Sequence, residues 1–241
     1  MHRGLLAGLL CSVMPALASA QVRPDATLLP LGRDSLPIYL IRGTDTVPTG
    51  TVIDELRQIT HGGVDALERV YRTNDRFLGR RLDTLVDTRL LLRPRLHRSR
   101  SDRGLETVTF DDSSGTGFTR AMRGDSSALQ AAFDTLVINA SSVDLFLRAA
   151  PLAEGLAFSV RAFSPTLRRI VTVSARVAGL DSVAREPSWR IVTDYAGTPV
   201  TFWVGQVSRK LNRQVMQLQP GVFLLIERGG VPVRRAGQRI I

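Results

Sequence analysis

The sequence predicts a mainly β protein in which short strands follow one another as an antiparallel meander, with one short helix near residues 141–150. Between residues 170 and 177 apolar and polar side chains alternate, and this period of two places one set on a buried face and the other in water. Turn residues recur about every 8–12 residues. No long helical period separates these segments, which favours antiparallel pairing over βαβ units.

The first 20 residues have the pattern of a signal peptide. A basic start at His2 and Arg3 precedes an apolar run over residues 5–17, and the small residues 18–20 form a cleavage site. We therefore expect a periplasmic or secreted protein, released by cleavage following Ala20. The apolar run is too short to span a bilayer comfortably, and no later segment approaches ~20 apolar residues, so we expect no transmembrane span in the mature chain.

The mature chain is expected to hold one domain with short flanking segments. Residues 21–37 contain three prolines and are predicted to be a loose leader. A single β-rich domain follows over residues 38–228, starting with a strand at 38–42. Residues 51–60 fit a helical face as well as a strand, and their β-branched side chains and the glycine turn after them favour the strand. Residues 229–241 form a basic tail, either a frayed end or a last edge strand.

The helix prediction depends on its two ends. Ser141 or Ser142 can cap the first turn, Asp144 suits the positive end of the helix dipole, and Pro151 stops the helix. We expect this helix to lie against a curved sheet.

Strands are also predicted over residues 189–195 and 200–204, where the alternation returns. In the second of these, Phe202 faces one way together with its neighbouring valines, and Trp203 faces the other way. Residues 223–226 are apolar on both faces, which indicates a strand that is covered on both sides or lies at a contact.

From about Tyr71 to Arg228 the chain resembles the bacterial exported family known as domain of unknown function 3108. The landmarks that carry the resemblance are Tyr71 with Leu78-Gly79, residues 144–152 with Gly155, and Trp203-Val204 with Arg209, Leu211 and Arg213. The resemblance implies an extended antiparallel sheet curled into an open or incomplete barrel in the periplasm. The family has no established catalytic residues, so it implies none here, and the segment before Gly50 departs from the family pattern.

The formal net charge is +10, and nearly all the cations are arginine. An arginine-favouring genome accounts for this excess, and so does a partner rich in phosphates or carboxylates, which arginine binds bidentately. The stretch 93–100 is the densest run: Arg93, Arg95 and His97 share one strand face, and Arg98 and Arg100 share the other. We consider the four arginines a candidate anion-binding rim, against the alternative of a solvated edge strand whose charges prevent aggregation.

Several chemistries are poorly supported by the sequence. Cys11 is the only cysteine and lies in the predicted signal peptide, so the mature chain has no disulfide or thiolate site. His61 and His97 are its only histidines, and no Gly-x-Ser-x-Gly elbow, phosphate-binding glycine loop or dinucleotide fingerprint is present. We therefore expect no catalytic residues, no metal site and no cofactor.

These observations favour an exported protein of unknown function that is a non-catalytic ligand-binding or envelope scaffold protein rather than an enzyme. Its expected partner is an anionic or amphiphilic envelope component, or another periplasmic protein, and not nucleic acid. A ligand cavity would be lined by Phe158, Phe163 or Trp203. The alternative is an envelope hydrolase or glycan-modifying enzyme, which needs two carboxylates, or a serine and a histidine, in one cleft.

Overall fold

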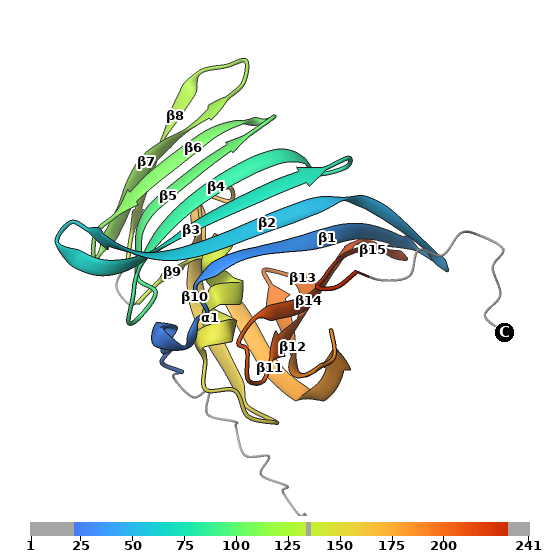
Figure 1. The fold of residues 1–241 in the computed structure, drawn as a ribbon. Coiled ribbons are helices and arrows are strands. Elements are labelled where there is room, and N and C mark those ends of the chain that lie inside the picture. The colour runs from blue at the N-terminus through green and yellow to red at the C-terminus, as the bar shows by residue number, and fades with distance from the viewer. Residues whose placement is uncertain (1–21, 134–135, 231–241) are drawn as a thin grey trace, which may run out of the picture.

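A computed structural model describes residues 22–133 and 136–230 of the chain. Fifteen strands form one sheet in which almost every strand pairs with its neighbours in sequence (Figure 1). The predicted signal peptide, residues 1–20, lies outside the described residues, as does the predicted tail from residue 231 onward.

The strands run in chain order with short turns between most of them. They are β1 (Gly32–Arg42), β2 (Asp45–His61), β3 (Val64–Asp75), β4 (Gly79–Thr88), β5 (Pro94–Ser101), β6 (Gly104–Phe110), β7 (Ser114–Ala121), β8 (Ser126–Ala132), β9 (Ile138–Asn139), β10 (Ala157–Ser164), β11 (Arg169–Val183), β12 (Glu186–Tyr195), β13 (Thr198–Gly205), β14 (Leu211–Gln219) and β15 (Val222–Glu227). The helical elements are η1 (Ala26–Leu28), η2 (Ala140–Ser142) and α1 (Val143–Ala149).

The sheet order is β8-β7-β6-β5-β4-β3-β2-β1-β15-β14-β13-β12-β11-β10-β9. All neighbouring pairs are antiparallel except β9 with β10, and β1 joins the two halves because it pairs with both β2 and β15. The edges are β8 and β9, so the sheet is not closed into a barrel. The predicted antiparallel, open-barrel fold with one short helix near residues 141–150 is confirmed, and β2 confirms the strand predicted at residues 51–60.

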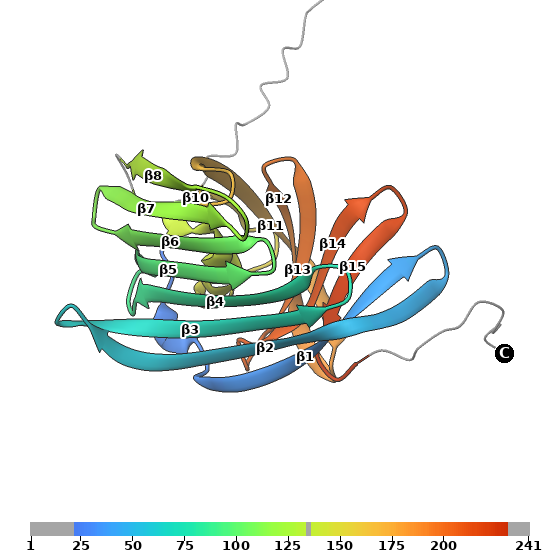
Figure 2. The same cartoon turned by 90° about the horizontal axis from the view of Figure 1, so that it is seen from above.

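The sheet bends back on itself, and α1 lies in the bend (Figures 1 and 2). Leu145 and Leu147 of α1 are buried in the same core as Leu36 of β1 and Phe202 of β13, so the helix packs against both halves of the sheet. The concave face of the sheet therefore holds the main core, in which alternate residues of β1, β11 and β13 join the side chains of the helix.

Residues 25–37 are packed more closely than their proline content suggests. The backbone N–H of Asp25 donates to the carbonyl of Ala149 at 2.9 Å, and Ala26 is buried against α1. Strand β1 begins at Gly32, six residues before the predicted start of the domain. Pro37 is tolerated there because it lies beyond the pairs between β1 and β15, where β1 has one neighbouring strand instead of two.

Across residues 22–133 and 136–230, no helix has both the length and the apolar character needed to cross a membrane.

Candidate ligand-binding cavity

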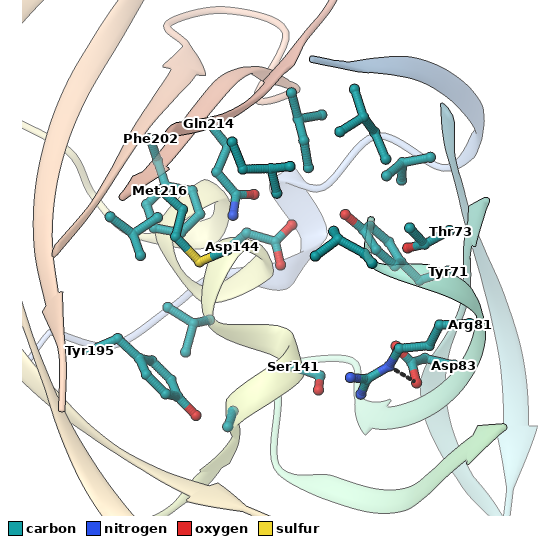
Figure 3. A pocket seen from close by; sticks show the side chains of 18 of the residues that line it. Tyr71, Thr73, Arg81, Asp83, Ser141, Asp144, Tyr195, Phe202, Gln214 and Met216 are labelled. Atoms are coloured by element: carbon teal, nitrogen blue, oxygen red, sulfur yellow. Dashed lines mark hydrogen bonds and ion pairs between the residues drawn. The ribbon is translucent and has the colours of Figure 1, made fainter. Parts of the chain in front are cut away.

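A cavity of about 540 Å³ lies on the concave side of the bent sheet (Figure 3). One wall comes from β1 to β4, the opposite wall from β12 to β15, and η2 and α1 supply the remainder. Apolar side chains from both walls and from the helix supply most of the lining surface, and they are Ile38, Val52, Leu78, Leu85, Ala140, Val143, Val200, Phe202, Met216, Leu224 and Ile226.

Polar and charged side chains make up about half of the residues that line the cavity. Tyr71 and Thr73 of β3 face Gln214 of β14 across the cavity in Figure 3. Burial raises the pKa of Tyr71 well above its usual range, so its phenol stays a neutral donor and acceptor. Tyr195 lines the cavity from β12, and Ser141 from η2. These groups can orient a ligand without adding charge.

The floor of the cavity is a buried ion network built on Arg69. Its guanidinium donates to both carboxylate oxygens of Asp54, from Nε at 2.7 Å and from Nη2 at 2.9 Å. It also donates to both oxygens of Asp144 on α1, at 2.7 and 2.8 Å, and to the carbonyl of Ser141 at 3.2 Å. The Arg69 side chain is 3% exposed. All of its donor capacity is therefore spent on tying β2 and α1 to β3.

A second buried arginine completes the floor. Arg148 of α1 lies 3.4 Å from Asp54 and donates from Nε to the carbonyl of Arg209 at 2.9 Å. Arg209 in turn donates to the carbonyl of Ala150, directly after the helix, at 3.0 Å. The turn between β13 and β14 thus holds the C-terminal end of α1.

The network is charge-balanced, with two arginines against two aspartates. Burial opposes ionisation of Asp54, but Arg69 and Arg148 outweigh it and lower the pKa of that carboxyl. Asp54 is therefore held in its ionised form as the partner of the arginines, and its role is to fix the floor of the cavity.

Two further arginines line the cavity where the strands end in turns. Arg81 of β4 donates from Nε to Asp83 at 2.8 Å (Figure 3), and its side chain is 39% exposed. Arg103 comes from the turn between β5 and β6. Because Asp83 offsets only one of these two cations, this end of the cavity suits an anionic group.

Two buried titratable groups with strongly shifted pKa values do not line the cavity. Burial raises the pKa of Asp87 to about 7, and one of its oxygens accepts the Ser142 hydroxyl at 2.7 Å. Burial lowers the pKa of His97 to about 4, although the nearby carboxylate of Asp83, 4.0 Å from Nε2, opposes that shift. Both groups therefore sit within the packed β4–β5 region, away from the space that a ligand could occupy.

The three aromatic residues predicted for a cavity do not line this one. Phe158 is buried against Phe146 of α1, with ring centroids 6.1 Å apart. Phe163 is fully buried in a separate cluster with Phe110 and Phe133. Trp203 points to the outer face of β13, and its ring nitrogen donates to Asp181 at 2.7 Å. The predicted alternation in β13 is correct, and it places Phe202 rather than Trp203 at the cavity.

The four arginines predicted as an anion-binding rim are not brought together by the structure. Arg95 contacts Asp112 at 2.9 Å and Arg93 lies 3.7 Å from the same carboxylate, whereas Arg98 and Arg100 are exposed on the other face of β5. His97, which lies between these two pairs of arginines in the sequence, is buried. The arginines at the cavity are outside the predicted stretch, because Arg81 belongs to β4 and Arg103 to the turn after β5.

The ion network was not among the features predicted from the sequence, although the alternation of β2 and β3 contains a signal for it. Arg69 falls in phase with Leu67 and Tyr71, and Asp54 in phase with Val52, so each charge occupies a position that alternation assigns to the buried face. A charged side chain in phase with apolar residues indicates an inward-facing ion pair.

The part of the chain that the structure describes contains no group of three or more histidine, cysteine, aspartate or glutamate side chains that could hold a metal ion.

Comparison with known proteins gives a likeness of fold. The chain is similar to the crystal structure of a β-barrel-like protein of domain of unknown function DUF1849 from Brucella abortus, with a TM-score of 0.51 and 12% sequence identity over 86% of this chain and 96% of that one. No family model matches the chain, and no curated protein matches it. The resemblance to domain of unknown function 3108 therefore stays a prediction, and the likeness at 12% identity concerns the β-barrel-like fold alone.

Proposed function

We propose that this protein is an exported, non-catalytic binding protein for an amphiphile with an acidic head group. The observation that supports this proposal is the cavity in the bend of the sheet, with a volume of about 540 Å³ and a mainly apolar lining that includes Arg81 and Arg103. Pockets of this size, with apolar walls and a few polar groups, are typical of small-molecule sites.

The position of the charges suggests how such a ligand would be oriented. Its apolar part would lie between Val52 on one wall and Phe202 and Met216 on the other. Its head group would lie near Arg81 and Arg103, because a guanidinium binds carboxylates and phosphates through paired hydrogen bonds. The ion network of Arg69 forms the floor and joins β3 to β2 and to α1.

The signal-peptide pattern of residues 1–20 supports a periplasmic location, and so does the resemblance to an exported family. Amphiphiles with acidic head groups are components of the cell envelope, so the location and the cavity point to the same class of ligand. An envelope scaffold would use the surface of the sheet and would not need this cavity.

The alternative of an envelope hydrolase has less support than ligand binding. The carboxylates nearest the cavity are Asp54, Asp83 and Asp144, and each accepts hydrogen bonds from an arginine. A general acid needs a raised pKa, which an arginine partner opposes.

A fluorescent fatty acid tests the proposal. 11-(Dansylamino)undecanoic acid has an apolar chain and a carboxylate, and its emission rises when it leaves water. We expect the protein to bind it at micromolar concentration. Met216→Trp places a larger side chain in the cavity and should weaken binding at least tenfold. The matched control is Val192→Trp, because Val192 is 44% exposed on the outer face of the same sheet and this variant should bind as the wild type does.

The methyl ester of the same probe tests whether the arginines bind the acidic head group. Arg103→Gln should weaken binding of the acid and leave binding of the neutral ester nearly unchanged. If Met216→Trp and Val192→Trp bind equally well, the probe does not occupy the cavity and the proposal fails.

A further inference from the structure

Four turns come together at one end of the curled sheet, next to the cavity. In an antiparallel meander alternate turns lie at the same end, so the turns β3–β4, β5–β6 and β7–β8 share one side of the sheet (Figure 1). The turn β10–β11 reaches them from the other half, because the Arg168 guanidinium donates to the Thr119 hydroxyl of β7 at 2.5 Å. We call residues 76–81, 102–104, 120–125 and 164–169 the docking rim.

The docking rim exposes large apolar side chains. Phe77 is 60% exposed, Met122 66%, Leu167 46% and Leu78 40%. Phe77 is held in this position, because Asp75 accepts hydrogen bonds from the backbone N–H groups of Phe77 at 2.8 Å and Leu78 at 2.7 Å. The side chains therefore project from ordered turns, and their apolar surface is exposed to water. This exposure is unfavourable, and contact with a partner would remove it.

The docking rim is also strongly basic, and the opposite end of the same strands is not. The rim contains eight arginines and two aspartates, and one of these, Asp102, accepts the backbone N–H of Arg80 at 2.9 Å. The opposite turns, residues 61–65, 88–93 and 111–114, contain two arginines and three aspartates. The positive charge is thus concentrated at the end where the apolar side chains project.

The docking rim and the cavity share residues. Leu78, Arg81 and Arg103 belong to the rim and also line the cavity. A surface bound at the rim would therefore lie at the end of the cavity that suits an acidic head group.

We propose that the docking rim binds the surface of an anionic lipid bilayer, and that the amphiphile passes between that bilayer and the cavity. This inference rests on the proposed function. Arginines interleaved with single aromatic and aliphatic side chains match a lipid interface, where the cations contact phosphates and the apolar side chains enter the region below the head groups. A protein partner is less favoured because the exposed apolar residues stand on separate turns and do not form one continuous face.

Vesicle flotation tests this inference. Vesicles of phosphatidylglycerol and phosphatidylethanolamine should carry the wild type upward, and pure phosphatidylcholine vesicles should not. Phe77→Asp combined with Met122→Asp should reduce the bound fraction at least tenfold. The matched control combines Leu90→Asp and Val207→Asp, because these residues are 68% and 87% exposed in turns at the opposite end. This control should float as the wild type does. All variants share the same residues 1–21, so differences between them come from the turns.

The outcomes separate this inference from the proposed function. If the rim variant no longer floats but still binds the dansyl probe, both proposals stand. If the wild type binds the probe but ignores anionic vesicles, or if the control variant loses flotation as fully as the rim variant, the rim is not a bilayer-docking surface and the binding function stands. If vesicles are bound but the probe is not, the proposed ligand fails while the docking surface remains.

Discussion

At the scale of single residues, Asp87 is a carboxyl whose protonation the fold controls. It is buried, one oxygen accepts the Ser142 hydroxyl, and the other makes no hydrogen bond to any described residue. Burial raises its pKa from 3.8 to about 7, even though the Ser142 hydrogen bond opposes the shift. Between these two values the folded protein holds a proton that the unfolded chain has released.

The expected result is a stability that falls as the pH rises through this window. Where the native state binds more protons than the unfolded state, the free energy of unfolding decreases with pH. Asp87→Asn cannot ionise, so its free energy of unfolding relative to the wild type should increase between pH 5 and pH 8 by at least about 1.4 kcal/mol, the value of one pKa unit. Urea denaturation at both pH values measures the difference.

The titration of His97 changes the free energy of unfolding with pH in the opposite direction, but it does not affect the comparison of Asp87→Asn with the wild type. Burial lowers its pKa to about 4, so its contribution to stability is lost as the pH falls from 6.5 through 4. Both proteins contain His97, and its effect cancels in their difference. A difference that stays constant between pH 5 and pH 8 would show that Asp87 is ionised in the folded protein.

At the scale of elements, the question is what keeps α1 in place. The helix has seven residues, which is too short to be stable in water by itself. Its apolar side chains are buried between the two halves of the sheet, and Arg69 holds Asp144 in its first turn. The helix is therefore a product of its tertiary contacts.

We expect Arg69→Met to be one of the most destabilising substitutions in the protein. It leaves two buried carboxylates, Asp54 and Asp144, without their main partner, and such losses cost about 3–5 kcal/mol. Arg57→Met is the matched control, because Arg57 is 59% exposed and pairs with Glu68 on the surface, where removal costs about 1 kcal/mol or less. Urea denaturation of both variants checks the contrast, and equal losses would contradict the importance of the network.

The same elements show how far the sequence could predict the structure. The strands at residues 170–177, 189–195 and 200–204 were predictable because alternation is local, and the helix was predictable from Asp144 in its first turn and from Pro151 after it. The predicted serine cap is wrong in its contacts, because Ser142 makes no capping hydrogen bond and its hydroxyl donates to Asp87. The cavity could not be predicted, because alternation places Phe202 and Trp203 on opposite faces of the strand but does not show which face of the sheet becomes concave. That choice depends on pairing between strands more than 100 residues apart in sequence, such as β1 and β15.

At the scale of the whole molecule, the two halves of the sheet are joined by strand pairing at one place among the residues that the structure describes. Strand β1 pairs with β2 on one side and with β15 on the other, and the edges β8 and β9 do not close the ring. The cavity is therefore bounded by two walls that meet at β1 and are held at their spacing by α1. A ligand between them would contact both walls, so its binding should change the exchange of backbone amides in both halves of the sheet.

Hydrogen exchange with and without the dansyl fatty acid should reveal this arrangement. Ligand binding stabilises the native state and lowers the population of local openings in the segments that it contacts. We expect slower exchange in β3 and β4 together with β12 to β14, and little change in β6 to β8, which do not line the cavity. A probe adsorbed on the outer surface would instead protect one half alone, and that result would exclude binding between the walls. Met216→Trp should abolish the protection in both walls at once, because each wall owes it to the same bound molecule.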